Sequence, residues 1–300
     1  MTADLFELLA QGIVLLDGAA GSNYFKMGMA PGAVTELWAD QHPDAVQALQ
    51  MAYVQAGCQI LYAPTLQAQP EALARCGMAE QTEALNARLV ERTRRAAQGN
   101  ALVAGDLSTM AGVLPSWDPA NLSRMVQGYR RQIRGLLDGG ADLLAAETLL
   151  YPLEAEAIRE AASQEGAGAI LYTFTLGPDG RLVQGQEAGP VLAELECNGA
   201  AAVGINCVPA CGQLSAWVRL LREEVRGPLV CKPNAGLPEV GPGGQAVYPT
   251  GIAEFVQVQL QAADAGATLL GGCCGTDPSY LQALAAALAD AGRLGVQNCH

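Results

Sequence analysis

Two adjacent cysteines, Cys273 and Cys274, lie among glycines in the segment 271–276. Neighbouring side chains of a regular strand point to opposite faces, so both thiols can reach one metal ion only where the strand has ended and the backbone bends. The flanking glycines permit that bend. A third thiol, Cys207, follows another apolar run. Three thiolates leave one position of a tetrahedral zinc ion open, which is the arrangement of a catalytic zinc site.

Other roles for these cysteines are open at this point. Free cysteine is often a small buried apolar residue, and Cys211 is an alternative third ligand because it follows Cys207 by four residues. The chain has nine cysteines at irregular spacing, which does not resemble a disulfide framework. We therefore expect a reducing compartment, the cytoplasm.

Composition limits the classes of function. Half of the 300 residues are apolar, which is enough to bury a sizeable core. Seventeen basic and thirty acidic residues give a formal charge of −13, which argues against a surface for nucleic acids or anionic membranes. The N-terminus lacks the pattern of a signal peptide, and no apolar run is long enough to span a membrane. With two histidines, His42 and His300, histidine-based catalysis is a poor expectation.

Short apolar runs alternate with longer helical patterns, which is typical of βα units. The predicted strands cover residues 13–17, 59–63, 101–105, 142–147, 169–174, 201–206, 228–232 and 267–271. The clearest helical patterns cover residues 43–56, 70–98, 121–138, 152–165, 212–225, 250–265 and 278–291. Eight such units predict an α/β fold, a single-domain (β/α)8 TIM barrel over residues 1–300.

A doubly wound sheet is the competing fold. It would usually carry a glycine-rich nucleotide loop after the first strand, but the segment 17–21 lacks the required glycine spacing. Another glycine-rich segment, 241–244, does not open a helix and is predicted to be a surface turn. Asp179 and Gly180 predict a tight hairpin turn within a long loop after the fifth strand.

Active sites of barrels lie at the C-terminal ends of the strands. The polar or reactive residues at these predicted ends are Asp17, Glu147, Cys207, Asn234, Cys273 and Cys274. A carboxylate such as Glu147 could hold the ammonium group of a ligand, or form a buried hydrogen bond. Asp17 could instead satisfy loop amides, and Asn234 could be a turn residue.

Four segments resemble the signatures of the homocysteine S-methyltransferase family: 16–22, 204–207, 233–238 and 271–276. Within that family, the homocysteine-binding module of cobalamin-dependent methionine synthase is the most similar. The resemblance covers essentially the whole chain, in order. It implies a (β/α)8 barrel with one zinc ion (Zn2+) held by Cys207, Cys273 and Cys274.

The resemblance also implies the substrate and its contacts. L-Homocysteine would bind zinc through its thiolate and be methylated to methionine. Its amino group would lie at Glu147, with Asp17 and Asn234 nearby. Main-chain amides around Gly18, Ala19 and Thr65 would take its carboxylate. The methyl donor is a methylcorrinoid protein or a small sulfonium or ammonium compound, and the sequence does not choose between them.

Three departures from the family pattern concern the acceptor and the donor. Residues 63–66 read Ala-Pro-Thr-Leu where the family usually has Thr-Asn-Thr-Phe. The segment 105–110, which includes Asp106, replaces a loop that usually contains Gly-Pro. Lys232 stands where methionine synthases commonly have an aromatic residue. Two alternatives therefore stay open: a methyltransferase with another thiol acceptor or a catabolic role, and a non-catalytic zinc- or thiol-binding barrel that docks a corrinoid protein.

Overall fold

A computed structural model describes residues 4–241 and 246–295. Eight parallel strands form one sheet, which confirms the predicted barrel. They are β1 (Val14–Leu15), β2 (Ile60–Tyr62), β3 (Leu102–Ser108), β4 (Leu143–Leu149), β5 (Ile170–Phe174), β6 (Ala202–Pro209), β7 (Leu229–Asn234) and β10 (Leu269–Leu270). Two further strands, β8 (Glu239–Val240) and β9 (Ala246–Val247), form a small antiparallel hairpin. The predicted turn at 241–244 falls outside the described residues except for its first position.

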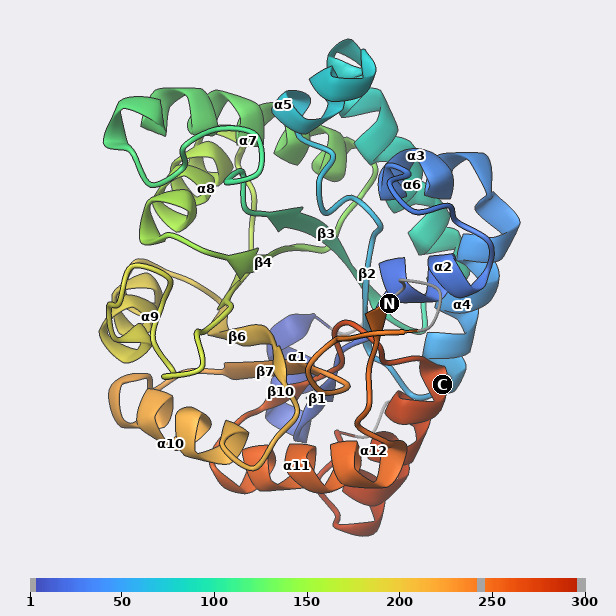
Figure 1. Cartoon of the computed structure of the whole chain (residues 1–300), viewed down its shortest axis with the longest axis vertical. Coiled ribbons are helices and arrows are strands. Elements are labelled where there is room, and N and C mark those ends of the chain that lie inside the picture. Colours follow the sequence, from blue (N-terminus) through green and yellow to red (C-terminus); the bar gives the residue numbers. More distant parts are fainter. Residues whose placement is uncertain (1–3, 242–245, 296–300) are drawn as a thin grey trace.

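The sheet closes on itself. Its order is β1-β10-β7-β6-β5-β4-β3-β2, and a parallel bridge between Leu16 and Ile60 joins its two edges. Two backbone hydrogen bonds support the closure, from Gln59 to the Leu15 carbonyl at 2.7 Å and from Asp17 to the Ile60 carbonyl at 3.1 Å. Closure leaves no exposed sheet edge, and Figure 1 shows the helices arranged as a ring around the strands.

The helices connect and cover the strands. They are α1 (Leu5–Gln11), α2 (Gly21–Lys26), α3 (Thr35–Gln41), α4 (Pro43–Gln55), α5 (Pro70–Leu73), α6 (Thr82–Ala97), α7 (Leu122–Asp138), α8 (Pro152–Glu165), α9 (Ala188–Cys197), α10 (Leu214–Glu224), α11 (Ile252–Asp264) and α12 (Pro278–Asp290). Within the ranges 4–241 and 246–295, no helix is both long and apolar enough to cross a membrane.

The prediction of a single helix over residues 70–98 is wrong. The chain forms α5, two short 3-10 turns and then α6. Gly77 adopts a left-handed conformation with φ of 73°, which ends the first helical stretch and which a residue with a side chain rarely adopts. The apolar spacing continues across this break, because both pieces pack against the same core.

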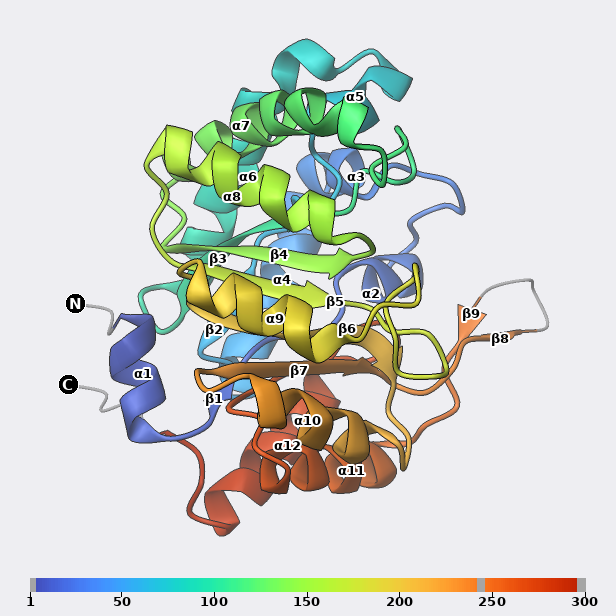
Figure 2. The same ribbon diagram turned by 90° about the vertical axis from the view of Figure 1, so that its left-hand side faces the viewer.

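The polar side chains of the site are inward-facing residues of the barrel strands. Alternate residues of a strand share one face, so Ala104 and Asp106 of β3 point to the same side, as do Ala145 and Glu147 of β4. Towards the N-terminal ends this inner face is apolar and packs against Leu5 and Leu8 of α1. Figure 2 shows α1 at one end of the barrel and the β8–β9 hairpin at the other. The polar positions therefore line the end that α1 leaves open.

Candidate functional site

Three thiols meet at the open end of the barrel. The Sγ atoms of Cys207, Cys273 and Cys274 all lie within 4.8 Å of one another. Cys207 belongs to β6, whereas the adjacent pair follows β10. Cys211, the alternative third ligand, lies outside this group. We call the three cysteines the thiol end of the site.

The adjacent pair can converge because the strand has ended. β10 stops at Leu270, and the Cys273 amide donates to the Pro233 carbonyl at 2.8 Å while the Cys274 carbonyl accepts from the Ala235 amide at 2.9 Å. Gly275 then adopts a left-handed φ of 84°. A Cβ atom there would lie 2.3 Å from the Tyr248 ring, so a glycine is required both by the turn and by the close approach of Tyr248.

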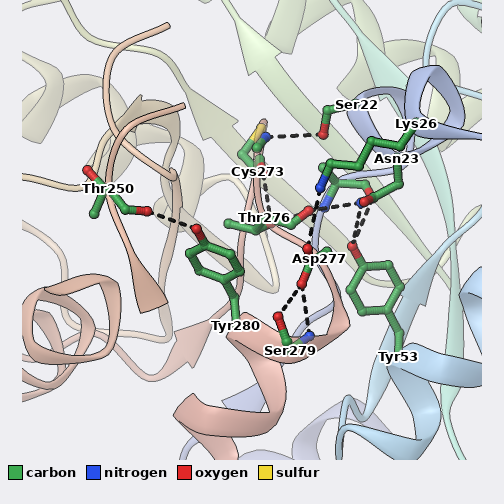
Figure 3. Close-up of polar contacts among 12 residues, drawn as sticks. Ser22, Asn23, Lys26, Tyr53, Thr250, Cys273, Thr276, Asp277, Ser279 and Tyr280 are labelled. Carbon is green, nitrogen blue, oxygen red and sulfur yellow. Dashed lines mark hydrogen bonds and ion pairs between the residues drawn. The ribbon is translucent and has the colours of Figure 1, made fainter. Parts of the chain in front are cut away.

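Side chains of distant helices hold this turn in place (Figure 3). The Gly275 amide donates to Ser22 Oγ at 3.1 Å. Asn23 Nδ2 donates to the Thr276 carbonyl at 2.9 Å, and Tyr53 Oη donates to the Ala19 carbonyl at 2.8 Å. Thr276 itself donates through Oγ1 to the Cys273 carbonyl at 2.8 Å. The turn is thus bound to α2 and to the segment after β1.

Cys207 reaches the pair through a strained bend. Its φ is 54°, and the register between β6 and β7 shifts between Asn206 and Pro209. Thr148 on β4 has the same unusual conformation, with φ of 58° at a second register shift. Left-handed residues other than glycine persist only where the surroundings enforce them, and they concentrate at functional sites. Bulges of this kind re-aim a side chain.

Asn206 joins the two bends. Its Nδ2 donates to Thr148 Oγ1 at 2.8 Å, and its Oδ1 accepts from the Thr148 amide, also at 2.8 Å. Asn206 is fully buried, and its Nδ2 lies 4.0 Å from Cys273 Sγ. A single side chain therefore fixes the position of Cys207 relative to the strand end that carries Glu147.

The thiols share their protons. Hydrogen bonds from Cys207 and Cys273 lower the pKa of Cys274 to about 3. The bond between Cys207 and Cys273, with that to Cys274 and with burial, raises the pKa of Cys273 well above its ordinary value. Asn234 Nδ2 lies 3.8 Å from Cys207 Sγ, where it can stabilise a thiolate. A trio that releases one proton readily and has polar donors beside it suits a thiophilic metal ion.

A cavity of about 550 Å³ opens beside the thiol end. The three cysteines line one side of it, together with Gly272 and Thr148. The floor of the cavity is formed by four buried charged residues, which we call the charged end: Asp17, Asp106, Glu147 and Lys232.

Lys232 is the centre of the charged end. Its Nζ lies 3.1 Å from Glu147 Oε2, 3.4 Å from Asp17 Oδ1 and 3.7 Å from the centroid of the Tyr62 ring. Burial alone would lower the pKa of Lys232, but the carboxylates of Glu147 and Asp17 raise it well above its ordinary value. A Cβ atom at Gly271 would lie 2.8 Å from Lys232 Cγ, so the glycine after β10 makes room for the lysine.

The carboxyls of the charged end differ in their partners. Asp17 accepts from the Tyr62 amide at 2.8 Å, yet burial raises its pKa to about 6. Burial, followed by the charge of Glu147, raises the pKa of Asp106 well above its ordinary value. Because a buried carboxylate without a cation is costly, this floor favours a ligand that brings positive charge.

The residues expected to hold an amino acid lie at different distances from the cavity. Asp17, Gly18, Ala19 and Glu147 line it, whereas Thr65 and Asn234 are not among the lining residues. The Ala19 amide donates to Thr276 Oγ1 at 3.2 Å, and the Thr65 amide donates to the Ala63 carbonyl at 2.7 Å. Within the described part of the chain, the Gly18 amide donates to no other residue and can receive a ligand.

Asp106 and Lys232 lie in the site, although the sequence marks them only as departures from the family pattern. The predicted third strand ends at residue 105, although β3 continues to Ser108. The missing signal is alternation: Ala104 and Asp106 occupy successive inward positions, as do Val230 and Lys232. Tyr248, which hydrogen-bonds Cys274, was also missed, since it lies far from any motif.

The geometry can be compared with known proteins. A family model described as Homocysteine S-methyltransferase matches residues 14–288. The methionine synthase of Mycobacterium leprae is 29% identical over 304 residues, which cover 95% of this chain and 25% of that protein. The homocysteine S-methyltransferase of Escherichia coli is 30% identical over 299 residues, which cover 92% of this chain and 95% of that protein.

Solved structures agree with the sequence matches. The metallated form of the homocysteine methyltransferase MmuM from Escherichia coli superposes with a TM-score of 0.79 and 29% identity, covering 92% of this chain and 96% of that one. The chain spans about a quarter of the length of the mycobacterial methionine synthases that it matches. The family match over most of the sequence, together with the shared barrel, shows that this chain belongs to the homocysteine S-methyltransferase family.

Proposed function

We propose that this chain transfers a methyl group to the sulfur of L-homocysteine and so forms methionine, with zinc held by Cys207, Cys273 and Cys274. The observation that carries the proposal is the cavity itself. Its lining combines three convergent thiols with buried charges suited to an amino acid. The named relatives in the family act on homocysteine, and this supports the choice of acceptor.

The residues fit the metal. Three sulfur ligands from one strand end and one bulge are typical of a zinc site that keeps a position open. Zinc bound there would supply a substrate thiolate at neutral pH, because a coordinated thiol is deprotonated. Asn234 and Tyr248 lie beside the ligands and can orient them through hydrogen bonds.

The chain's own residues would bind and orient the amino acid. The free amide of Gly18 can donate to the substrate carboxylate, and the carboxyls of the charged end can accept from its ammonium group. The separation between the charged end and the thiol end would then determine where the substrate sulfur lies relative to the three cysteines. Burial of the cavity floor excludes water from these contacts, which strengthens them.

Methyl transfer then needs no general base in the protein. The homocysteine thiol would release its proton to solvent on binding, its sulfur would form a bond to the methyl carbon, and the bond from that carbon to the donor would break with its electron pair left on the donor. The donor is a methylcorrinoid protein or a small sulfonium or ammonium compound. Free thiols at Cys207, Cys273 and Cys274 suit a reducing compartment such as the cytoplasm.

Cobalt substitution tests the proposal. Cobalt(II) would be loaded anaerobically, and L-homocysteine titrated while the thiolate-to-metal charge-transfer absorption is followed. We expect a saturable rise with homocysteine and a weaker response with cysteine. The side chain of cysteine is one carbon shorter, so its sulfur would not reach the metal as well. Cobalt binding without any response to homocysteine would reject this acceptor and favour another thiol or a non-catalytic barrel.

Turnover assays separate the donors. Methylcobalamin and S-methylmethionine would each be supplied with L-homocysteine, and methionine would be measured. Formation of methionine with one of them identifies the donor class. Binding of zinc and homocysteine without turnover with either would support the docking alternative.

A further inference from the structure

The charged end carries more negative than positive groups. Asp17, Asp106 and Glu147 contribute three carboxyls, and Lys232 contributes one ammonium group. Glu36 is a fourth buried carboxyl on the cavity wall, but its Oε1 already accepts from the Gln67 amide at 2.7 Å. A buried carboxylate is stable only when it is paired or well hydrogen-bonded. The charge balance of the floor therefore favours the binding of one more cation.

Two of the three floor carboxyls already have an ion pair with Lys232. Lys232 Nζ contacts Glu147 Oε2 at 3.1 Å and Asp17 Oδ1 at 3.4 Å. The other oxygen of Asp17 accepts from the Tyr62 amide. The Tyr62 ring lies against the lysine and holds it between the two carboxyls. A ligand ammonium at Glu147 would have to share that residue with Lys232.

Asp106 is different. Its side chain is 5% exposed and lines the cavity. Asp17 Oδ1 also lacks a hydrogen bond but faces Lys232, whereas Asp106 Oδ1 has neither a hydrogen bond nor an ion pair among the described residues. Its backbone is fixed on both sides by Thr65, whose Oγ1 donates to the Asp106 carbonyl at 2.9 Å and accepts from the Asp106 amide at 3.0 Å. Gln132 adds a contact to the Thr65 carbonyl at 2.7 Å. The chain thus fixes the backbone of Asp106 and leaves its carboxyl unpaired among the described residues.

We propose that Asp106 is the residue that receives the ammonium group of the amino-acid substrate, and that Lys232 holds Glu147 and Asp17 as the fixed counter-charge of the floor. This inference rests on the proposed function, since it names the specificity residue of the same cavity. It differs from the family-based expectation, in which Glu147 takes the amino group. It also gives Thr65 a role, as the residue that positions Asp106.

Two thiols that differ in the amino group test the inference. L-Homocysteine and 4-mercaptobutanoate share the thiol, the chain length and the carboxylate, but only homocysteine has the ammonium group. Their affinities would be measured by cobalt charge-transfer titration for the wild type, Asp106→Asn, Asp106→Glu and Glu147→Gln. Asp138→Asn is the matched control, because it makes the same chemical change at an exposed residue of α7.

In Asp106→Asn we expect the affinity for homocysteine to fall roughly 10- to 100-fold, the range for a hydrogen bond to a charged group. The affinity for 4-mercaptobutanoate should change less than about twofold by the same reasoning. Asp106→Glu should recover part of the loss, and Asp138→Asn should bind as the wild type does. An equal loss for both thiols, or a selective loss of homocysteine in Glu147→Gln but not in Asp106→Asn, would overturn the inference.

A thiol-free probe separates this inference from the proposed function. L-2-Aminobutanoate keeps the ammonium and carboxylate groups but has no sulfur, and its binding can be measured by calorimetry. Binding that depends on Asp106, without any cobalt response to homocysteine, would support the inference while rejecting the methyltransferase proposal. Binding of this probe that is equal in the wild type and Asp106→Asn, or absent from both, would count against Asp106.

Discussion

The thiol end and the charged end line one cavity, but the chain builds them differently. The thiol end comes from two short segments and depends on backbone shape: a left-handed Gly275, a strained Cys207 and a turn fixed by hydrogen bonds. The charged end comes from single residues on or after β1, β3, β4 and β7, and depends on the electrostatic balance of their side chains.

The difference shows what each region can tolerate. A metal site needs its ligands within a few tenths of an ångström of their place, so strain in the backbone is justified there. A buried ion cluster needs every charge to be matched, so the loss of one member leaves the others unpaired. Damage to the thiol end should therefore remove function with little effect on stability, and damage to the charged end should affect both.

The largest expected effect is at the thiol end. Cys207→Ala should lose bound zinc, and methyl transfer should fall by more than the roughly 100-fold that is typical when a partner of a metal ligand is removed. Zinc content and methionine formation would be measured together. Cys211→Ala is the matched control and should retain both, because Cys211 lies outside the trio. A Cys207→Ala protein that methylates homocysteine at the normal rate would exclude the assignment.

The next effect is on stability, at the charged end. Lys232→Met leaves Asp17 and Glu147 without their cation, so the free energy of unfolding should fall by about 3–5 kcal/mol, the cost of breaking a buried ion pair. Urea unfolding would measure it. Lys26→Met removes a lysine that is 58% exposed in its pair with Asp277 and should cost less than about 1 kcal/mol. Similar costs for the two variants would refute the contrast between buried and surface charge.

A smaller effect is expected from pH. The pKa of Asp17 rises from 3.8 to about 6 on folding, so between these values the folded state binds more protons than the unfolded state does. The contribution of Asp17 to stability therefore increases as the pH falls from 6 to 4, by up to about 1.4 kcal/mol per pH unit. The difference in unfolding free energy between the wild type and Asp17→Asn, measured from pH 4 to 7, should show this slope. A difference that grows with rising pH would contradict it.

The smallest effect concerns the residue that links the two ends. Asn206→Ala removes both hydrogen bonds to Thr148, so Cys207 loses its support and zinc affinity should weaken by roughly 10- to 100-fold. Competition with a chelator would measure the affinity. Asn86→Ala removes an equally buried asparagine that bonds Ala68 and Thr82 away from the site, and it should destabilise the protein without changing zinc affinity. Equal zinc affinities for the two variants would show that Asn206 is only structural.

The two regions also differ in how far the sequence predicts them. The barrel and the convergence of Cys207 with the later pair could be predicted, because glycines and apolar runs mark each strand end locally. The sequence did not assign Lys232 and Asp106 to the site. A charged residue after an apolar run usually indicates that the strand has ended, but β3 continues past Asp106 and β7 past Lys232. The pairing of Lys232 with Glu147 depends on which strands face each other across the barrel, and no local pattern contains that.

The order of the strands along the chain has a consequence for synthesis. Asp17, Asp106 and Glu147 all belong to the first half of the sequence, and Lys232 follows Glu147 by 85 residues. On the ribosome, the first four strands therefore emerge with three carboxyls on the face that will become the barrel floor, well before their cation exists. Burial of those groups without a counter-charge is unfavourable. Packing of the first four strands into a closed half barrel therefore contributes little stabilising free energy. Final closure of the floor must wait for the seventh strand of the barrel to leave the exit tunnel.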